Sequence, residues 1–123
     1  MCYRIGMRKP VFEFYTRKNG HNEFIEFLES LPEKDQQKLL AVISNVQEYG
    51  ILKAQKMKWV KKVGKNLFEL RSELRGNIQR AIYFHVVDSR FIITHGFSKK
   101  TQKTPAREIA HAVEIRNEFE GGK

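Results

Sequence analysis

The chain has 123 residues, a length that predicts one domain, and 41% of them are hydrophobic, which indicates a globular fold and excludes a disordered chain. Its net charge of +9 predicts a polyanionic partner. No apolar run is long enough to cross a bilayer, and the first residues lack the apolar segment of a secretory signal, so we expect no membrane association. Cys2 is the single cysteine, which excludes an internal disulfide and predicts a reducing compartment, the cytoplasm.

The first half of the chain contains one strand signal and two helix signals. Residues 10–16 alternate with the two-residue period of a strand. Apolar residues at helical spacing then predict a helix from Asn22, which is a suitable N-cap. Ser30 and the glutamate three positions later have the spacing of a capping box for a second helix, expected to run to about residue 49 and to end at Gly50.

The second half predicts a sheet and a last helix. Residues 51–66 are rich in lysine, and we interpret them as a connecting loop with room for a short strand. Three strands are expected over residues 67–72, 78–87 and 90–97, and the tight turns between them make neighbouring strands antiparallel. Thr104 as a cap, with a proline after it, predicts the start of the last helix.

The expected order of elements is β-α-α-β-β-β-α, which is an α+β fold. We expect a single domain over residues 1–123, with a small twisted antiparallel sheet, an N-terminal helix pair and a C-terminal helix. Both faces of the strand over residues 78–87 are largely apolar, so the helix pair is expected to cover one face and the last helix part of the other. Residues 1–8 and 120–123 are expected to be flexible ends.

Positive charge is concentrated in the middle of the chain. Residues 51–107 contain 14 lysines and arginines against three acidic residues, whereas the remainder carries 9 basic and 11 acidic residues. This asymmetry predicts nucleic acid as the partner. The alternative is a solvated basic surface that only favours solubility.

Two arginines lie on strands that are expected to be neighbours. Arg80 is at a covered face, where an unpaired guanidinium is costly, so it needs an anionic partner. One interpretation is a salt bridge to Glu69 or Glu73 on the next strand. The other is that Arg71 and Arg80 lie side by side and bind a phosphate between them. Arg75, at the turn, is a candidate nucleic-acid contact or simply an exposed residue.

Two basic segments flank this hairpin. Lys99, Lys100 and Lys103 follow the last strand and precede a helix N-terminus, which favours anions, so they are candidate phosphate contacts. Lys61 and Lys62 are further candidate nucleic-acid contacts. In both segments the alternative is a solvated loop. The tryptophan at position 59 is placed to stack on a base or, as the alternative, to cover a sheet edge.

The sequence indicates no resident metal or cofactor. Its four histidines show no ligand spacing with one another, and the Gly64-Lys65 pair lacks the rest of a phosphate-binding loop. No serine or cysteine has a visible base partner. His95 shares a strand face with apolar residues, which is more typical of a hydrogen-bonded core histidine than of a catalytic one.

Three segments resemble the RelE/ParE toxin superfamily, and most of all its HigB-like, phage-associated branch: LFELR at residues 67–71, R-x-x-Y at 80–83, and HGFSKKTQKTP at 95–105. The resemblance implies a RelE-like fold and a metal-independent endoribonuclease that cuts messenger RNA on the ribosome. It also implies a partner antitoxin with a helix-turn-helix fold. ParE-type members share the fold but poison DNA gyrase, so a gyrase poison, or a binding module without cleavage, is the alternative.

The site residues of the resembled family carry over in part. The strand arginine of the R-x-x-Y motif corresponds to Arg80, the arginine ending the preceding strand to Arg71, and the basic residue after the last strand to Lys99 or Lys100. RelE has paired lysines before its leucine-arginine and a tyrosine near its C-terminus. This chain has Phe68 and Glu69 in place of the paired lysines, and it has no tyrosine after Tyr83. The general base of RelE therefore does not carry over.

These correspondences imply a mechanism. The 2′-hydroxyl of the RNA attacks the adjacent phosphate, and Arg71 and Arg80 stabilise the negative charge that develops on it. Lys100 protonates the leaving oxygen. The general base remains open between a lysine, Glu73 and His95.

Overall fold

The computed structural model describes residues 9–98 and 103–121, so the expected flexible ends over 1–8 and 122–123 lie outside the described residues. Its elements, in chain order, are β1 (Val11–Phe14), α1 (Glu23–Glu29), α2 (Glu33–Tyr49), α3 (Ile51–Lys56), β2 (Val60–Gly64), β3 (Leu67–Leu74), β4 (Asn77–Val87), β5 (Arg90–Ser98) and α4 (Ala106–Gly121). The last turn of α4 includes part of the expected C-terminal flexible segment. No helix among these residues is long and apolar enough to span a bilayer.

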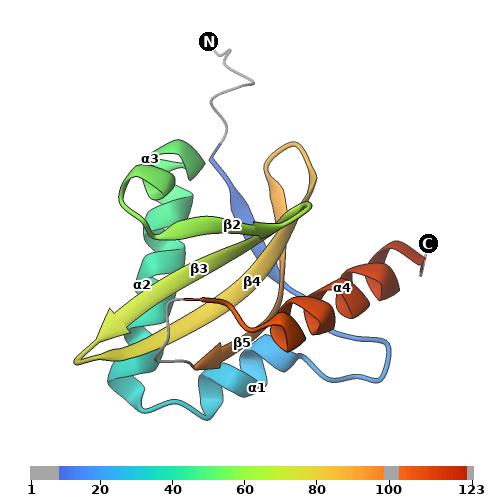
Figure 1. Cartoon of the computed structure of the whole chain (residues 1–123), viewed down its shortest axis with the longest axis horizontal. Helices are drawn as coiled ribbons and strands as arrows, with labels where there is room; N and C mark the ends of the chain where they lie inside the picture. The colour runs from blue at the N-terminus through green and yellow to red at the C-terminus, as the bar shows by residue number, and fades with distance from the viewer. Residues whose placement is uncertain (1–8, 99–102, 122–123) are drawn as a thin grey trace.

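The α+β class is confirmed, and the sheet has the order β1-β5-β4-β3-β2 (Figure 1). The β2–β3, β3–β4 and β4–β5 pairs are antiparallel, as expected. The expectation of a wholly antiparallel sheet is wrong for β1, which pairs with β5 in parallel. Parallel neighbours need a long connection, and here all of α1 to β4 lies between the two strands.

Residues 51–66 form a short helix and a short strand, which confirms the anticipated strand and corrects the interpretation of the rest as a loop. Gly50, with φ 89°, ends α2, and α3 begins at the next residue. Ala54 anchors this short helix because it is fully buried. Lys58 then has φ 63°, a left-handed turn that leads the chain into β2.

The predicted helix caps are partly confirmed. The side chain of Asn22 accepts a hydrogen bond from the backbone N–H of Ile25, so it caps α1 as expected. The capping box at Ser30 is wrong, because Ser30 ends α1 and its hydroxyl donates to the carbonyl of Phe27. Pro32 occupies the N-cap of α2 without a side-chain hydrogen bond.

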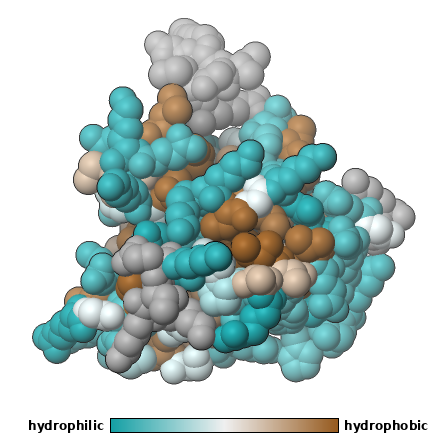
Figure 2. Space-filling view, viewed as in Figure 1, coloured by the Kyte–Doolittle hydropathy of each residue, from teal (hydrophilic) through white to brown (hydrophobic). Residues whose placement is uncertain are grey.

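Both faces of β4 are covered, as its apolar pattern predicts. Ala81 and Tyr83 face the larger core, under α1 and α2, whereas Ile82 and Phe84 face a smaller core shared with α4. The smaller core is covered less completely. Figure 2 shows apolar surface between the hydrophilic regions that lie over β2 and α4.

Gly96 on β5 allows α1 to pack closely on the sheet. A Cβ atom at Gly96 would collide with the ring of Phe27 and lie 3.0 Å from the carbonyl oxygen of Arg80. We expect Gly96→Ala to lower the free energy of unfolding by about 1–3 kcal/mol, as measured by urea denaturation. Gly64→Ala is the matched control, because its nearest atoms would be 3.6 Å away, an ordinary contact. Equal stability of the two variants would contradict this packing.

Candidate functional site

The two hairpin arginines lie directly opposite each other. The register of β3 and β4 pairs Arg71 with Arg80, so the expectation that they lie side by side on adjacent strands is confirmed. A two-residue turn sets this register, and both of its residues have positive φ, 55° at Arg75 and 84° at Gly76. The turn is therefore centred one residue earlier than expected.

The anion between the two guanidiniums is the carboxylate of Glu69. Its Oε2 lies 3.6 Å from Nη1 of Arg80, and its Oε1 lies 3.9 Å from Nε of Arg71. The hydroxyl of Thr104 donates a 2.8 Å hydrogen bond to the same Oε2. The salt-bridge interpretation of Arg80 is thus confirmed for Glu69, and the repulsion between the two arginines is offset within the protein.

The members of this cluster differ in exposure. The side chains of Glu69 and Arg80 are fully buried, whereas that of Arg71 is 21% exposed. Burial lowers the pKa of the Arg80 guanidinium, the carboxylate of Glu69 opposes that shift, and the charge of Arg71 adds to it. Arg71 is therefore the member of the pair with surface for a ligand, and Arg80 holds Glu69 in place beneath it.

Lys61 and Lys62, the two candidate nucleic-acid contacts on β2, lie on different faces of the sheet, and only Lys61 is on the face of this cluster. Lys61 is opposite Glu69 in the β2–β3 register, so it belongs to the same face of the sheet. Lys62 is opposite Phe68 and belongs to the other face. The alternation of a strand therefore separates two candidates that are neighbours in the sequence.

The second basic segment is only partly described. Lys103 is exposed and directly precedes Thr104, whose hydrogen bond ties this segment to Glu69. Thr104 was expected to cap the last helix, and its hydroxyl instead contacts a strand 35 residues away in sequence. Lys99 and Lys100 lie outside the described residues, so their roles stay predictions.

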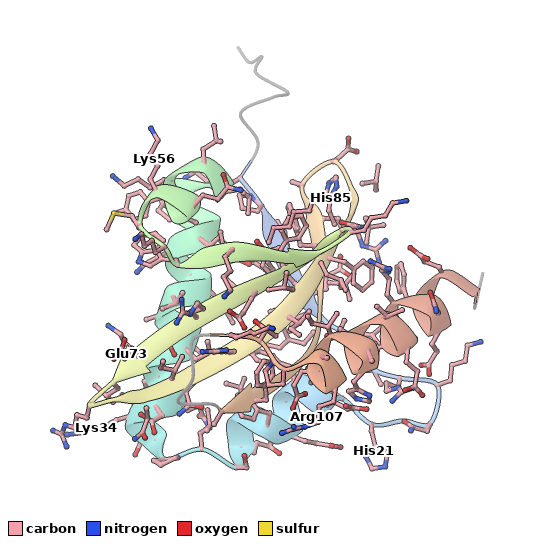
Figure 3. The ribbon with its side chains drawn as sticks, in the orientation of Figure 1. His21, Lys34, Lys56, Glu73, His85 and Arg107 are labelled. Atoms are coloured by element: carbon pink, nitrogen blue, oxygen red, sulfur yellow. The ribbon has the colours of Figure 1, made fainter. Side chains whose placement is uncertain are left out.

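Arg75 is exposed in the β3–β4 turn, and it lines a shallow depression of about 290 Å³ beside the acidic start of α2. Glu73, a candidate general base, is exposed on the outer edge of β3 (Figure 3). Any role in nucleic-acid binding or proton transfer stays a prediction for both.

His95 has hydrogen-bond partners on both ring nitrogens. Its Nε2 lies 3.0 Å from Oε1 of Glu108 on α4, and its Nδ1 lies 3.0 Å from the hydroxyl of Thr94. Burial lowers the pKa of His95, and the hydrogen bond to Glu108 opposes the shift. These contacts favour the interpretation of His95 as a core residue that joins β5 to α4.

The sequence did not reveal how α4 is held over the sheet. Arg17, in the loop after β1, lies 2.7 Å from Glu23 and 2.9 Å from Glu118. His111 lies 2.6 Å from the same Glu23. The contacts of Arg17 with Glu118 and of His111 with Glu23 join residues 101 and 88 positions apart, for which a single sequence carries no signal. Among the described residues, no group of three or more His, Cys, Asp or Glu side chains is arranged to hold a metal ion.

One family model matches most of the chain. A family model described as "Phage derived protein Gp49-like (DUF891)" matches residues 26–117, well over half of the chain. The matched part runs from α1 into α4 and includes Glu69, Arg71, Arg80 and Thr104. A search of curated proteins found none that matches the chain.

Proposed function

Because this chain belongs to the Gp49-like family of phage-derived, toxin-like proteins, we propose that it is the toxin of a type II toxin–antitoxin system and cleaves messenger RNA on the ribosome. The observation that carries the proposal is the guanidinium of Arg71, partly exposed and held next to Glu69 and Arg80 within the basic part of the chain, residues 51–107. A planar guanidinium in a fixed position suits the charge that develops in phosphoryl transfer. The proposal includes that the chain is a member of the HigB-like branch of the RelE/ParE toxins and that its partner is a helix-turn-helix antitoxin.

The proposed reaction is a transesterification within the RNA strand. The 2′-oxygen of one nucleotide gives its proton to a general base, for which a lysine, Glu73 and His95 are the sequence-based candidates, and bonds to the adjacent phosphorus, while the bond from phosphorus to the 5′-oxygen of the next nucleotide breaks. Arg71 stabilises the added negative charge on the phosphoryl oxygens. Arg80 acts through Glu69, with which it shares a buried ion pair, and so positions Arg71. The leaving 5′-oxygen takes a proton, for which Lys100 is the sequence-based candidate.

The end chemistry of cellular transcripts tests the reaction. After induction of the parent protein without its antitoxin, we expect growth arrest and new 5′-hydroxyl ends inside coding regions, mapped by ligation that requires this end. Intact messengers together with an SOS response would contradict the nuclease and support a gyrase poison with the same fold. Growth without arrest would contradict both.

A further inference from the structure

A cavity opens at the edge of β3, next to the arginine pair. It has a volume of about 310 Å³ and is lined by Lys58, Trp59, Arg71, Ser72, Glu73 and Ile78. It exists because β2 pairs with β3 no further than Leu70, after which a single backbone hydrogen bond joins Arg71 to Trp59. The left-handed turn at Lys58 sets where β2 begins and so places Trp59 at the mouth.

The lining combines the groups that bind a nucleotide. Trp59 is only partly buried, with its other contacts on the larger core and on the ring of Tyr49, 6.3 Å away between centroids. An indole of this kind offers a face on which a base can stack. Arg71 and Lys58 supply positive charge for phosphate on either side.

Ser72 and Glu73 also line this cavity. Ser72 is only 4% exposed, and side chains alternate along a strand, so its hydroxyl lies on the other face of β3 from Arg71 and Glu73. The polar groups that β3 makes available to a ligand are therefore those of Arg71 and Glu73. The carboxylate of Glu73, on the same strand, adds an acceptor that is exposed at the mouth.

From these contacts the geometry points to a base-binding subsite: the cavity takes one nucleotide of single-stranded RNA, with its base on Trp59 and its phosphate on Arg71. This inference rests on the proposed function and adds to it the recognition of a base next to the cleaved phosphate. Glu73 accepts hydrogen bonds but donates none, so the subsite favours a base with an exocyclic amino group. Cytosine is therefore bound more tightly than uracil, which has a carbonyl at the same position.

Trp59 is the single tryptophan of the chain, so its fluorescence reports on this cavity alone. We expect saturable quenching by 2′-O-methyl oligocytidine, which cannot be cleaved, and weaker binding of 2′-O-methyl oligouridine. An abasic oligomer with the same number of phosphates should leave the fluorescence unchanged. Equal quenching by the abasic and the base-bearing oligomers would overturn the inference.

Variants separate stacking from general loss of structure. With a labelled oligocytidine, Trp59→Leu should weaken binding by about 5- to 150-fold, the range for losing one base–aromatic stack, whereas Trp59→Phe should keep most of it. Tyr49→Leu is the matched control, because Tyr49 contacts Trp59 but does not line the cavity. Glu73→Gln should reduce the preference for cytosine over uracil. Equal affinities of Trp59→Leu and the parent would overturn the subsite.

The two proposals fail separately. If the parent generates 5′-hydroxyl ends in cells but its fluorescence does not respond to bases, the nuclease stands and the subsite is wrong. If the fluorescence responds to bases but no transcript is cut, the subsite is supported and the proposed reaction is wrong.

Discussion

Replacing Arg80 by alanine is expected to lower the free energy of unfolding by about 3–5 kcal/mol, the range measured when one partner of a buried ion pair is removed. Both Arg80 and Glu69 are fully buried, so the substitution leaves the carboxylate of Glu69 in the protein interior with a weaker set of partners. Thr104 would still donate its hydrogen bond, and Arg71 would remain 3.9 Å away. The measurement is urea denaturation of the purified variant and parent.

Two further variants test whether the buried charge is the cause. Arg80→Met combined with Glu69→Gln removes both charges while keeping an acceptor for Thr104, so it should recover much of the lost stability. Arg107→Ala is the matched control, because that arginine side chain is 70% exposed, and it should change stability by no more than about 0.5 kcal/mol. Identical denaturation midpoints for Arg80→Ala and Arg107→Ala would contradict the buried pair.

This result affects how toxicity assays are interpreted. A variant that lacks Arg80 can lose growth arrest because it no longer folds, and such a loss would not identify a catalytic residue. Arg80 is completely buried, so the stability of this variant has to be measured together with its toxicity.

Arg71→Ala is expected to reduce the rate of messenger cleavage by about 100-fold or more, the usual effect of losing one contact to a developing oxyanion. The buried pair of Arg80 with Glu69 stays intact in this variant, so the protein should remain folded. The measurement is the cleavage rate of a defined messenger on purified ribosomes, with circular dichroism to confirm folding.

Arg90→Ala is the matched control for this loss of charge. Arg90 pairs with Glu13 on the exposed start of β5 and takes no part in the cluster, so its removal should leave the cleavage rate unchanged. A parental rate in a folded Arg71→Ala protein would show that this guanidinium does not act on the phosphate. An equal loss in both variants would show that cleavage responds only to net charge.

Much of the fold could be predicted because it depends on local patterns. The two-residue period of β4 places Ala81 and Ile82 on opposite faces, and both faces are covered as expected. The sequence placed Arg71 and Arg80 side by side on adjacent strands, but they are directly opposite only because the turn lies at Arg75 and Gly76, one residue earlier than expected. In residues 51–66 the short strand was anticipated, whereas the lysines obscured a short helix before it.

The sequence by itself therefore determined the α+β class, the hairpin and the concentration of positive charge in residues 51–107. Only the tertiary structure decided that β1 is parallel to β5, that Glu69 is the anion between the arginines, and that Arg80 is buried while Arg71 reaches the surface. Turn geometry and strand period act between near neighbours in the chain. Burial and ion pairing depend on segments that meet only after folding, as Thr104 meets Glu69.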